Sequence, residues 1–119
     1  MFTDAFPILT TRDLPRALTF YRDLLGGAVR YQFPAEGQPI YVSLAIGDAA
    51  VGLSFEDRAT VNDRIGLWLY ADDCDAAVAR LRAAGVRVEQ DPADQPWGER
   101  MAVVLDPDGN RVMIATRGS

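Results

Sequence analysis

Apolar residues recur with helical spacing in two segments of the chain, 13–26 and 72–85. In the first segment Asp13 is suited to cap a helix, Pro15 falls in the first turn, and Gly26 follows the last apolar position. The apolar stripe of this segment consists of Leu14, Leu18, Tyr21 and Leu25. The second segment opens with Asp72-Asp73-Cys74-Asp75 and ends at Gly85, 59 residues after Gly26. Two helices are therefore predicted, and they are related by a repeat of about half the chain.

Each predicted helix is surrounded by strand-like runs in the same order. One run precedes each helix, at 6–11 in the first half and at 65–71 in the second. Three runs follow it, at 28–33, 40–46 and 49–55 in the first half and at 86–90, 99–105 and 111–116 in the second. Gly47-Asp48 and the segment 106–110 have the composition of tight turns. The prediction is a single α+β domain, 1–119, made of two βαβββ modules at about 1–57 and 63–119. The alternative is an α+β sandwich without a tandem repeat, such as a ferredoxin-like fold.

Two motifs make a resemblance to a known family specific. They are LTTRDLPRALTFYRDLLG at 9–26 and DPDGNRV at 106–112. Together with the tandem modules they resemble the vicinal oxygen chelate superfamily, which includes glyoxalase I, extradiol dioxygenases, fosfomycin-modifying enzymes and bleomycin resistance proteins. The resemblance runs along the whole chain. It implies the glyoxalase/bleomycin-resistance fold, in which the modules form curved sheets around a cup that holds the ligand.

The enzymes of that superfamily hold a divalent metal in the cup, and the resemblance places their ligand positions on residues that cannot bind one. These positions fall on Phe6, Gly66, Met113 and, for the fourth ligand of glyoxalases, near Gly52. A hard or borderline cation needs imidazole nitrogen or carboxylate oxygen, which none of these side chains provides. We therefore expect no metal, no other cofactor and no metal-assisted catalysis.

The bleomycin resistance proteins are metal-free relatives that bind their antibiotic instead of modifying it, and three segments resemble theirs. Gln95-Pro96-Trp97-Gly98 resembles their Gln-Pro-Trp-Gly, and Trp68-Leu69-Tyr70 resembles a Trp-x-Trp stretch in the same place. The run 7–13, Pro-Ile-Leu-Thr-Thr-Arg-Asp, is similar to their first strand. This subgroup is the best match. The resemblance also implies a homodimer with ligand grooves at the interface.

The alternation of side chains along a strand predicts which residues line the cup. If position 66 faces the cup, Trp68 and Tyr70 do so too, whereas Leu67, Leu69 and Ala71 face the helices. The same parity places in the cup Phe6, Ile8 and Thr10 of the first strand and Arg111, Met113 and Ala115 of the last. Such an aromatic and thioether lining would hold a flat heteroaromatic ligand by stacking. The alternative is that these aromatic residues are ordinary core.

The charge balance adds a preference for a cationic ligand. Twelve basic residues stand against 17 acidic ones, a net charge of −5, which argues against nucleic acid and anionic membranes as partners and favours cations. Candidate acidic residues at the rim of the cup are Asp48, Glu56, Asp57, Asp63, Asp91, Asp94 and Glu99. The last three flank Trp97. For each carboxylate the alternative is ordinary solvated surface.

The rest of the composition excludes several classes of protein. The chain has no histidine, which excludes an imidazole base, a Ser-His-Asp triad and a His-ligated metal. No apolar run approaches the roughly 18 residues of a transmembrane helix, and we expect no signal peptide. The single cysteine, Cys74, fits a reducing compartment, so we expect the cytoplasm. Its position at a helix start would lower its pKa, but a nucleophile there lacks a His base.

These observations predict a metal-free, non-catalytic protein that confers antibiotic resistance by sequestering an aromatic, cationic antibiotic of the bleomycin class. The predicted ligand-binding residues are Trp97, Trp68, Tyr70, Phe6, Gly98, Glu99, Asp94, Asp48, Arg111 and Met113. One alternative is a metal-independent lyase or isomerase, with Glu99 or Glu56 as the base and Arg111 stabilising an oxyanion. Another is a binder of a different antibiotic, such as mitomycin or a thiopeptide, or of a metabolite.

Overall fold

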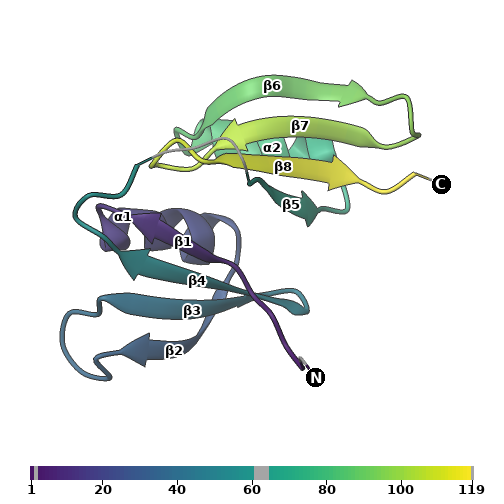
Figure 1. Ribbon diagram of the computed structural model, residues 1–119. Coiled ribbons are helices and arrows are strands. Elements are labelled where there is room, and N and C mark those ends of the chain that lie inside the picture. The colour runs from purple at the N-terminus through teal and green to yellow at the C-terminus, as the bar shows by residue number, and fades with distance from the viewer. Residues whose placement is uncertain (2, 61–64, 119) are drawn as a thin grey trace. The chain divides into compact units, whose positions relative to one another are not determined.

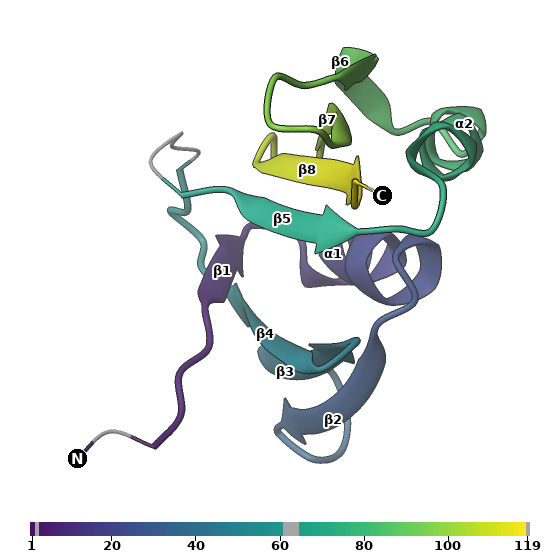
Figure 2. The ribbon, with the colours of Figure 1, turned by 90° about the vertical axis from the view of Figure 1, so that its right-hand side faces the viewer.

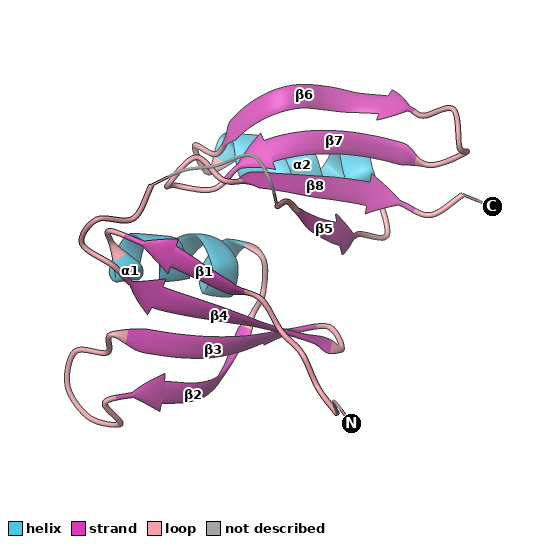
Figure 3. Ribbon diagram, in the orientation of Figure 1, coloured by secondary structure: helices cyan, strands magenta, loops and turns pink. Residues whose placement is uncertain are grey.

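The computed structural model describes residues 1, 3–60 and 65–118 (Figure 1). The chain divides into two compact units, Met1–Thr60 and Val61–Ser119, which we call unit 1 and unit 2. Each unit contains one four-stranded mixed sheet and one helical segment (Figure 3). The element order in each is βαβββ, so the predicted fold class is confirmed.

Unit 1 is built from β1 (Ile8–Thr11), α1 (Leu14–Leu18), η1 (Thr19–Leu24), β2 (Ala28–Phe33), β3 (Tyr41–Ile46) and β4 (Ala49–Phe55). The strand order in its sheet is β1-β4-β3-β2. β1 runs parallel to β4, and the other neighbouring strands are antiparallel. The turn predicted at Gly47-Asp48 joins β3 to β4, and Gly47 has a φ of 58°, which glycine adopts without strain.

Unit 2 repeats this arrangement with β5 (Leu67–Tyr70), α2 (Cys74–Ala83), β6 (Arg87–Asp94), β7 (Arg100–Leu105) and β8 (Arg111–Thr116). The order is β5-β8-β7-β6, again with the first strand parallel to the last. The turn at 106–110 joins β7 to β8. There the buried Asp106 carboxylate accepts hydrogen bonds from the backbone N–H of Asp108 at 2.9 Å and of Asn110 at 2.7 Å.

The two helical segments begin alike but differ in length by one residue. Asp13 caps α1 by accepting a hydrogen bond from the Arg16 N–H at 3.0 Å, and Asp73 caps α2 through the Ala76 N–H at 3.1 Å. In unit 1 the helix continues as the π-helical turn η1, in which the Leu25 N–H donates to Phe20 O, five residues back. A π turn holds one more residue than an α turn, so it takes up the difference.

Each helix covers one face of the sheet in its own unit (Figure 2). The covered face of unit 1 buries Val42, Leu44, Val51 and Leu53, and that of unit 2 buries Ala102, Val104, Val112 and Ile114. We call the opposite face of each sheet its open face. Burial of the aliphatic covered faces supplies the main stabilisation of each unit.

The strand boundaries differ from the predicted ones in ways that concern the site. β1 and β5 are shorter than predicted, so Phe6 and Gly66 precede their strands. β6 extends beyond the predicted end at residue 90 and includes Asp91 and Asp94. Its pairing with β7 shifts register at two places, which allows the strand to continue through Pro92. In the described residues no helix is long and apolar enough to cross a membrane.

Candidate functional site

The pairing of β5 with β8 places the predicted aromatic residues on the open face of unit 2. Trp68 is the partner of Met113, and Tyr70 is the partner of Ala115. Leu67 and Leu69 pair with Val112 and Ile114, which lie on the covered face with α2. The observed alternation is the one predicted from the sequence. Its consequence is an aromatic and thioether surface on a rigid sheet.

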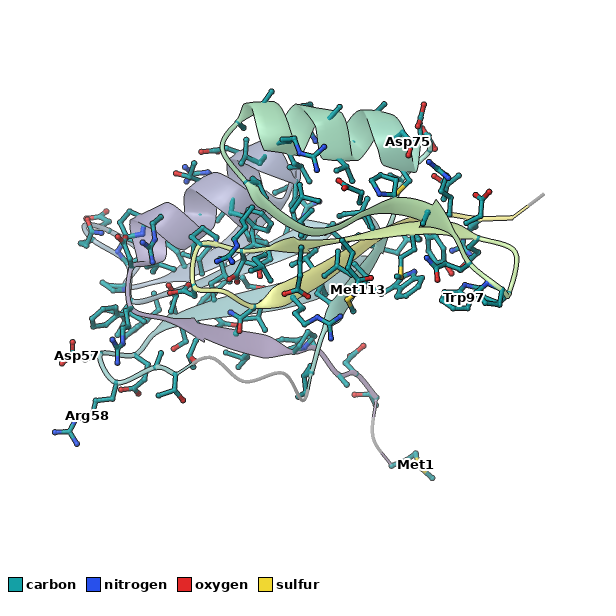
Figure 4. The ribbon with its side chains drawn as sticks, turned by 90° about the horizontal axis from the view of Figure 1, so that it is seen from above. Met1, Asp57, Arg58, Asp75, Trp97 and Met113 are labelled. Carbon is teal, nitrogen blue, oxygen red and sulfur yellow. The ribbon has the colours of Figure 1, made fainter. Side chains whose placement is uncertain are left out.

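Three aromatic side chains meet on this surface, and we call Trp68, Tyr70 and Trp97 the aromatic cluster. The ring centroid of Trp68 lies 6.1 Å from that of Tyr70 and 6.4 Å from that of Trp97. Two of the rings come from β5, and Trp97 comes from the turn between β6 and β7 (Figure 4). The exposed fractions are 37% for Trp68, 44% for Tyr70 and 57% for Trp97. Large aromatic side chains with this much free surface are suited to stacking against a ligand.

Gly98 and its neighbours form the tight turn that presents Trp97. The Gln95 N–H donates to Glu99 O at 2.8 Å, and the Gly98 N–H donates to Gln95 O at 3.0 Å. Gly98 has a φ of 98°, which a residue with a β-carbon rarely adopts. In this structure the role of Gly98 is therefore to shape the turn.

Glu99 interacts with two members of the aromatic cluster. The Trp97 indole Nε1–H donates a hydrogen bond to Glu99 Oε1 at 2.9 Å. The pKa of Tyr70 is raised above its ordinary value, mainly by a hydrogen bond with the Glu99 side chain and then by burial and by the charge of Glu99. The site thus combines aromatic surface with one fixed negative charge, which suits a ligand that is both flat and cationic.

Arg117 also belongs to this surface, although sequence reasoning missed it. Its Cζ lies 3.8 Å from the centroid of the Tyr70 ring, a close cation–π contact. Residue 117 has the parity of Met113 and Ala115, so continuing the alternation of β8 by one step would have found it.

The acidic residues predicted around Trp97 do not form a free cluster. Asp91 is paired with Arg82, and Asp94 is paired with Arg100 at 3.2 Å. Arg100 also contacts Asp75 at 2.9 Å, so it connects the start of α2 to the end of β6. Of the three carboxylates expected there, only Glu99 contacts the aromatic cluster through the interactions described above.

The other predicted site residues do not belong to the aromatic cluster. Phe6 and Asp48 belong to unit 1, where Phe6 is half-exposed and Asp48 lies in the exposed hairpin turn. Arg111 is on the open face of unit 2, with its Nε 3.3 Å from Glu89 Oε1. The rim candidates Glu56 and Asp57 are exposed at the end of unit 1. Asp63 lies outside the described residues.

The positions that carry the metal in related enzymes occur in both units. Gly66 precedes Trp68 by two residues, just as Phe6 precedes Ile8, and the partners of Trp68 and Ile8 are Met113 and Gly52. Position 6 of unit 1 therefore corresponds to position 66 of unit 2, and position 52 corresponds to position 113. They contribute a thioether, a phenyl ring and two glycines, which do not fit a divalent cation. Within 1, 3–60 and 65–118 no group of three or more Cys, Asp or Glu residues could hold a metal ion.

Cys74 contradicts the expectation of a lowered pKa. The thiol is 1% exposed, and its Sγ donates to Ile114 O at 3.2 Å. Burial raises the pKa of Cys74, and the charge of Asp75 raises it further. Desolvation is the largest cause of this shift, in keeping with the place of Cys74 in the core of unit 2.

Comparison with known proteins identifies the family. Residues 5–114 match the model of the Glyoxalase/Bleomycin resistance protein/Dioxygenase superfamily. The chain belongs to this superfamily. The fold and the family predicted from the sequence are thus confirmed. The superfamily includes both enzymes and binding proteins, so membership alone does not assign an activity.

Three relatives illustrate the breadth of the superfamily. The mycobacterial protein "Putative glyoxylase CFP32", from Mycobacterium bovis and M. tuberculosis, is 38% identical over 94 residues. The match covers 78% of this chain but only 36% of that protein, so the chain spans about a third of its length. Lactoylglutathione lyase from Agrobacterium tumefaciens has a TM-score of 0.73 at 26% identity, covering 96% of this chain and 92% of its own. The bleomycin resistance determinant encoded on transposon Tn5 has a TM-score of 0.74 at 22% identity, covering 98% of both chains, and shows the shared fold.

Proposed function

We propose that this superfamily member is a non-catalytic binding protein that sequesters an aromatic, cationic antibiotic of the bleomycin class. The observation that carries the proposal is the aromatic cluster with the Glu99 carboxylate hydrogen-bonded to Trp97. Three partly exposed rings offer stacking area, and the carboxylate attracts a positive charge.

Two further features support binding without metal-assisted chemistry. The four positions that hold the metal in related enzymes carry Phe6, Gly66, Met113 and Gly52. Glu99 already accepts the indole N–H of Trp97, which makes it less available as a general base. The proposed protein is cytoplasmic and works without a cofactor.

We also propose that the protein acts as a homodimer. On the open face of unit 1, Ile8, Tyr31 and Phe33 are each more than half exposed. Their strands pair so that these three side chains lie on one side of the sheet. An apolar sheet face of this kind is normally buried in an assembly. Light scattering after gel filtration tests this part, and a monomer at working concentration would refute it.

Tryptophan fluorescence during titration with bleomycin tests the sequestration itself. The chain has two tryptophans, both in the aromatic cluster, so a stacked ligand should quench both. The titration is made with metal-free and copper-loaded bleomycin, at low and physiological salt. Saturation near one ligand per chain, at micromolar or tighter affinity, is the expected result. A flat titration would refute binding of this antibiotic.

A metal-independent lyase or isomerase is the second candidate, and the similarity to CFP32 favours it. In this case Glu99 acts as the base, and Arg111, paired with Glu89, stabilises the developing oxyanion. The test is an assay with the hemithioacetal of methylglyoxal and glutathione in the presence of a chelator. Turnover that is lost in Glu99→Gln would establish this activity in place of sequestration.

A further inference from the structure

The face of the Tyr70 ring carries a positively charged group of the protein itself. The Arg117 Cζ lies 3.8 Å from the ring centroid, within the range of a stacked guanidinium. Arg117 is exposed, and none of the carboxylates in the described part of the chain forms an ion pair with it. Cation–π attraction to Tyr70 is therefore the contact that places its guanidinium.

The backbone brings Arg117 to this place. Gly118 passes so close to the turn after β6 that a β-carbon on it would lie 2.5 Å from the carbonyl oxygen of Gly98. The segment that follows β8 thus runs beside the turn that carries Trp97. Arg117 directly precedes Gly118, and its side chain extends over the ring of Tyr70.

The surroundings of the Tyr70 ring suit a cation that is flat. The guanidinium of arginine is planar, delocalised and less strongly hydrated than an ammonium group, so it stacks on an aromatic face with little desolvation. The ring centroid of Trp68 lies 6.1 Å from that of Tyr70. A planar cation joined directly to an aromatic ring can therefore contact Tyr70 and Trp68 together.

We propose that the Tyr70 ring face is a subsite for a planar, delocalised cation, a guanidinium or amidinium group of the ligand, and that Arg117 occupies this subsite when the ligand is absent. The inference rests on the proposed function, because it names the chemical group that the same site recognises. The ligand displaces Arg117 and exchanges one stacked cation for another. Because an exposed cation–π contact is weak, the displacement lowers affinity by only about two- to fivefold.

Three small probes test the preference for a planar cation. Benzamidinium carries a flat amidinium on an aromatic ring, benzylammonium has the same ring and charge with a tetrahedral cation, and benzamide is flat but neutral. Binding is followed by the two indole N–H signals in proton–nitrogen correlation spectra, assigned with Trp97→Phe and Trp68→Phe. Benzamidinium should bind at least fivefold more tightly than either control. Equal affinity for the three probes would overturn the proposal.

Two substitutions test the place of binding and the role of Arg117. Arg117→Ala should strengthen benzamidinium binding by about two- to fivefold, because the internal competitor is gone. Tyr70→Leu should abolish the preference for benzamidinium over benzamide, whereas Tyr70→Phe, which retains the ring, should keep it. Arg12→Ala, at an exposed position of unit 1, is the matched control and should bind as the wild type does. Unchanged affinity in Arg117→Ala would show that Arg117 does not compete.

The same titrations separate the subsite from the proposed function. If benzamidinium binds as expected and bleomycin does not, the subsite stands and its natural ligand is another planar cation. If bleomycin binds but the probes do not discriminate and Arg117→Ala has no effect, sequestration stands and the cation subsite is wrong.

Discussion

The terminal methyl group of Met113 fills the space beside Gly66. A β-carbon added to Gly66 would lie 2.5 Å from Met113 Cε and 3.4 Å from its Sδ. These are two of the positions that carry the metal in related enzymes, and here they are packed against each other. The loss of the metal ligands is thus accompanied by hydrophobic filling of the place where they would meet.

This packing predicts a difference between two glycine substitutions. In Gly66→Ala the flexible end of Met113 can move, so we expect the free energy of unfolding to fall by less than about 1 kcal/mol. In Gly52→Ala the new methyl would meet the rigid Tyr41 ring, at 2.5 Å from its hydroxyl oxygen, and Ile8 at 3.1 Å. Overpacking there should cost about 2 kcal/mol. Chemical denaturation measures both variants, and a Gly66→Ala that is the less stable of the two would contradict this packing.

Trp97→Ala should weaken binding of bleomycin by about 2 kcal/mol, because it removes the most exposed ring of the aromatic cluster. The free energy of unfolding should change by less than about 1 kcal/mol, since more than half of the side chain is exposed. Isothermal titration and thermal denaturation give the two quantities. Trp97→Phe, which keeps a ring but loses the hydrogen bond to Glu99, is the control and should retain most of the affinity. Loss of folding in Trp97→Ala would identify Trp97 as core.

Glu99→Gln should lower the pKa of Tyr70 toward its ordinary value, because it removes the carboxylate whose hydrogen bond and charge favour the neutral phenol. In the wild type the raised pKa means that the folded state holds this proton more tightly than the unfolded state does. The resulting stabilisation is complete below the ordinary tyrosine range and is lost as pH rises through the raised value. Ultraviolet titration of phenolate formation, with Tyr70→Phe to identify the signal, measures the shift. An unchanged Tyr70 titration in Glu99→Gln would refute the contact.

Glu99→Gln should also weaken the binding of a cationic ligand, and the loss should be largest at low salt. Titrations at two ionic strengths compare the variant with Glu36→Gln, which removes an exposed charge between β2 and β3 of unit 1. Equal salt dependence in the two variants would argue against a specific role for Glu99.

Asp106→Ala should reduce the free energy of unfolding by about 2–3 kcal/mol. Its buried carboxylate accepts hydrogen bonds from the backbone of Asp108 and Asn110 and from Asn110 Nδ2 at 2.9 Å. Removing the acceptor leaves these donors unsatisfied. Asp48→Ala, at the exposed turn of the other unit, should change stability by less than about 0.5 kcal/mol. Similar effects of the two substitutions would contradict this assignment.

Cys74 should react slowly with a thiol reagent in the native protein at pH 8 and rapidly after unfolding. Burial both shields the sulfur and raises its pKa, so little thiolate is present. Because the folded pKa is the higher one, the associated stabilisation is lost as pH rises above the ordinary cysteine range. Absorbance of the released reagent measures the rate, with and without denaturant. Rapid reaction of the native thiol would show that the start of α2 opens readily.

The repeated elements and the positions of Trp68 and Tyr70 could be predicted from the sequence, because both depend on local patterns. Alternation along 67–70 was enough to place Trp68 and Tyr70 on the face opposite α2. The ion pairs of Asp91 and Asp94 could not be predicted from local patterns. Arg82 and Arg100, which pair with Asp91 and Asp94, come from other elements and approach only through tertiary packing.

The extension of β6 and the π turn have different causes. The segment Asp91–Asp94 contains proline and two aspartates, which favour a loop, and it is a strand because β7 offers paired backbone groups. The π turn has no apolar signature that separates it from an α-helix, and only the hydrogen bond from Leu25 to Phe20 reveals it.

The π turn also affects how the two halves of the chain correspond in sequence. Positions 6 and 66 correspond at an offset of 60, whereas positions 52 and 113 correspond at an offset of 61 and the glycines that end the helices at 59. The two halves thus differ by single residues in turns and loops, whereas the pairing of their strands follows the same pattern. Aligning the two halves at a single fixed offset would therefore underestimate their sequence similarity. Pairing the residues by their strand partners gives the correct alignment.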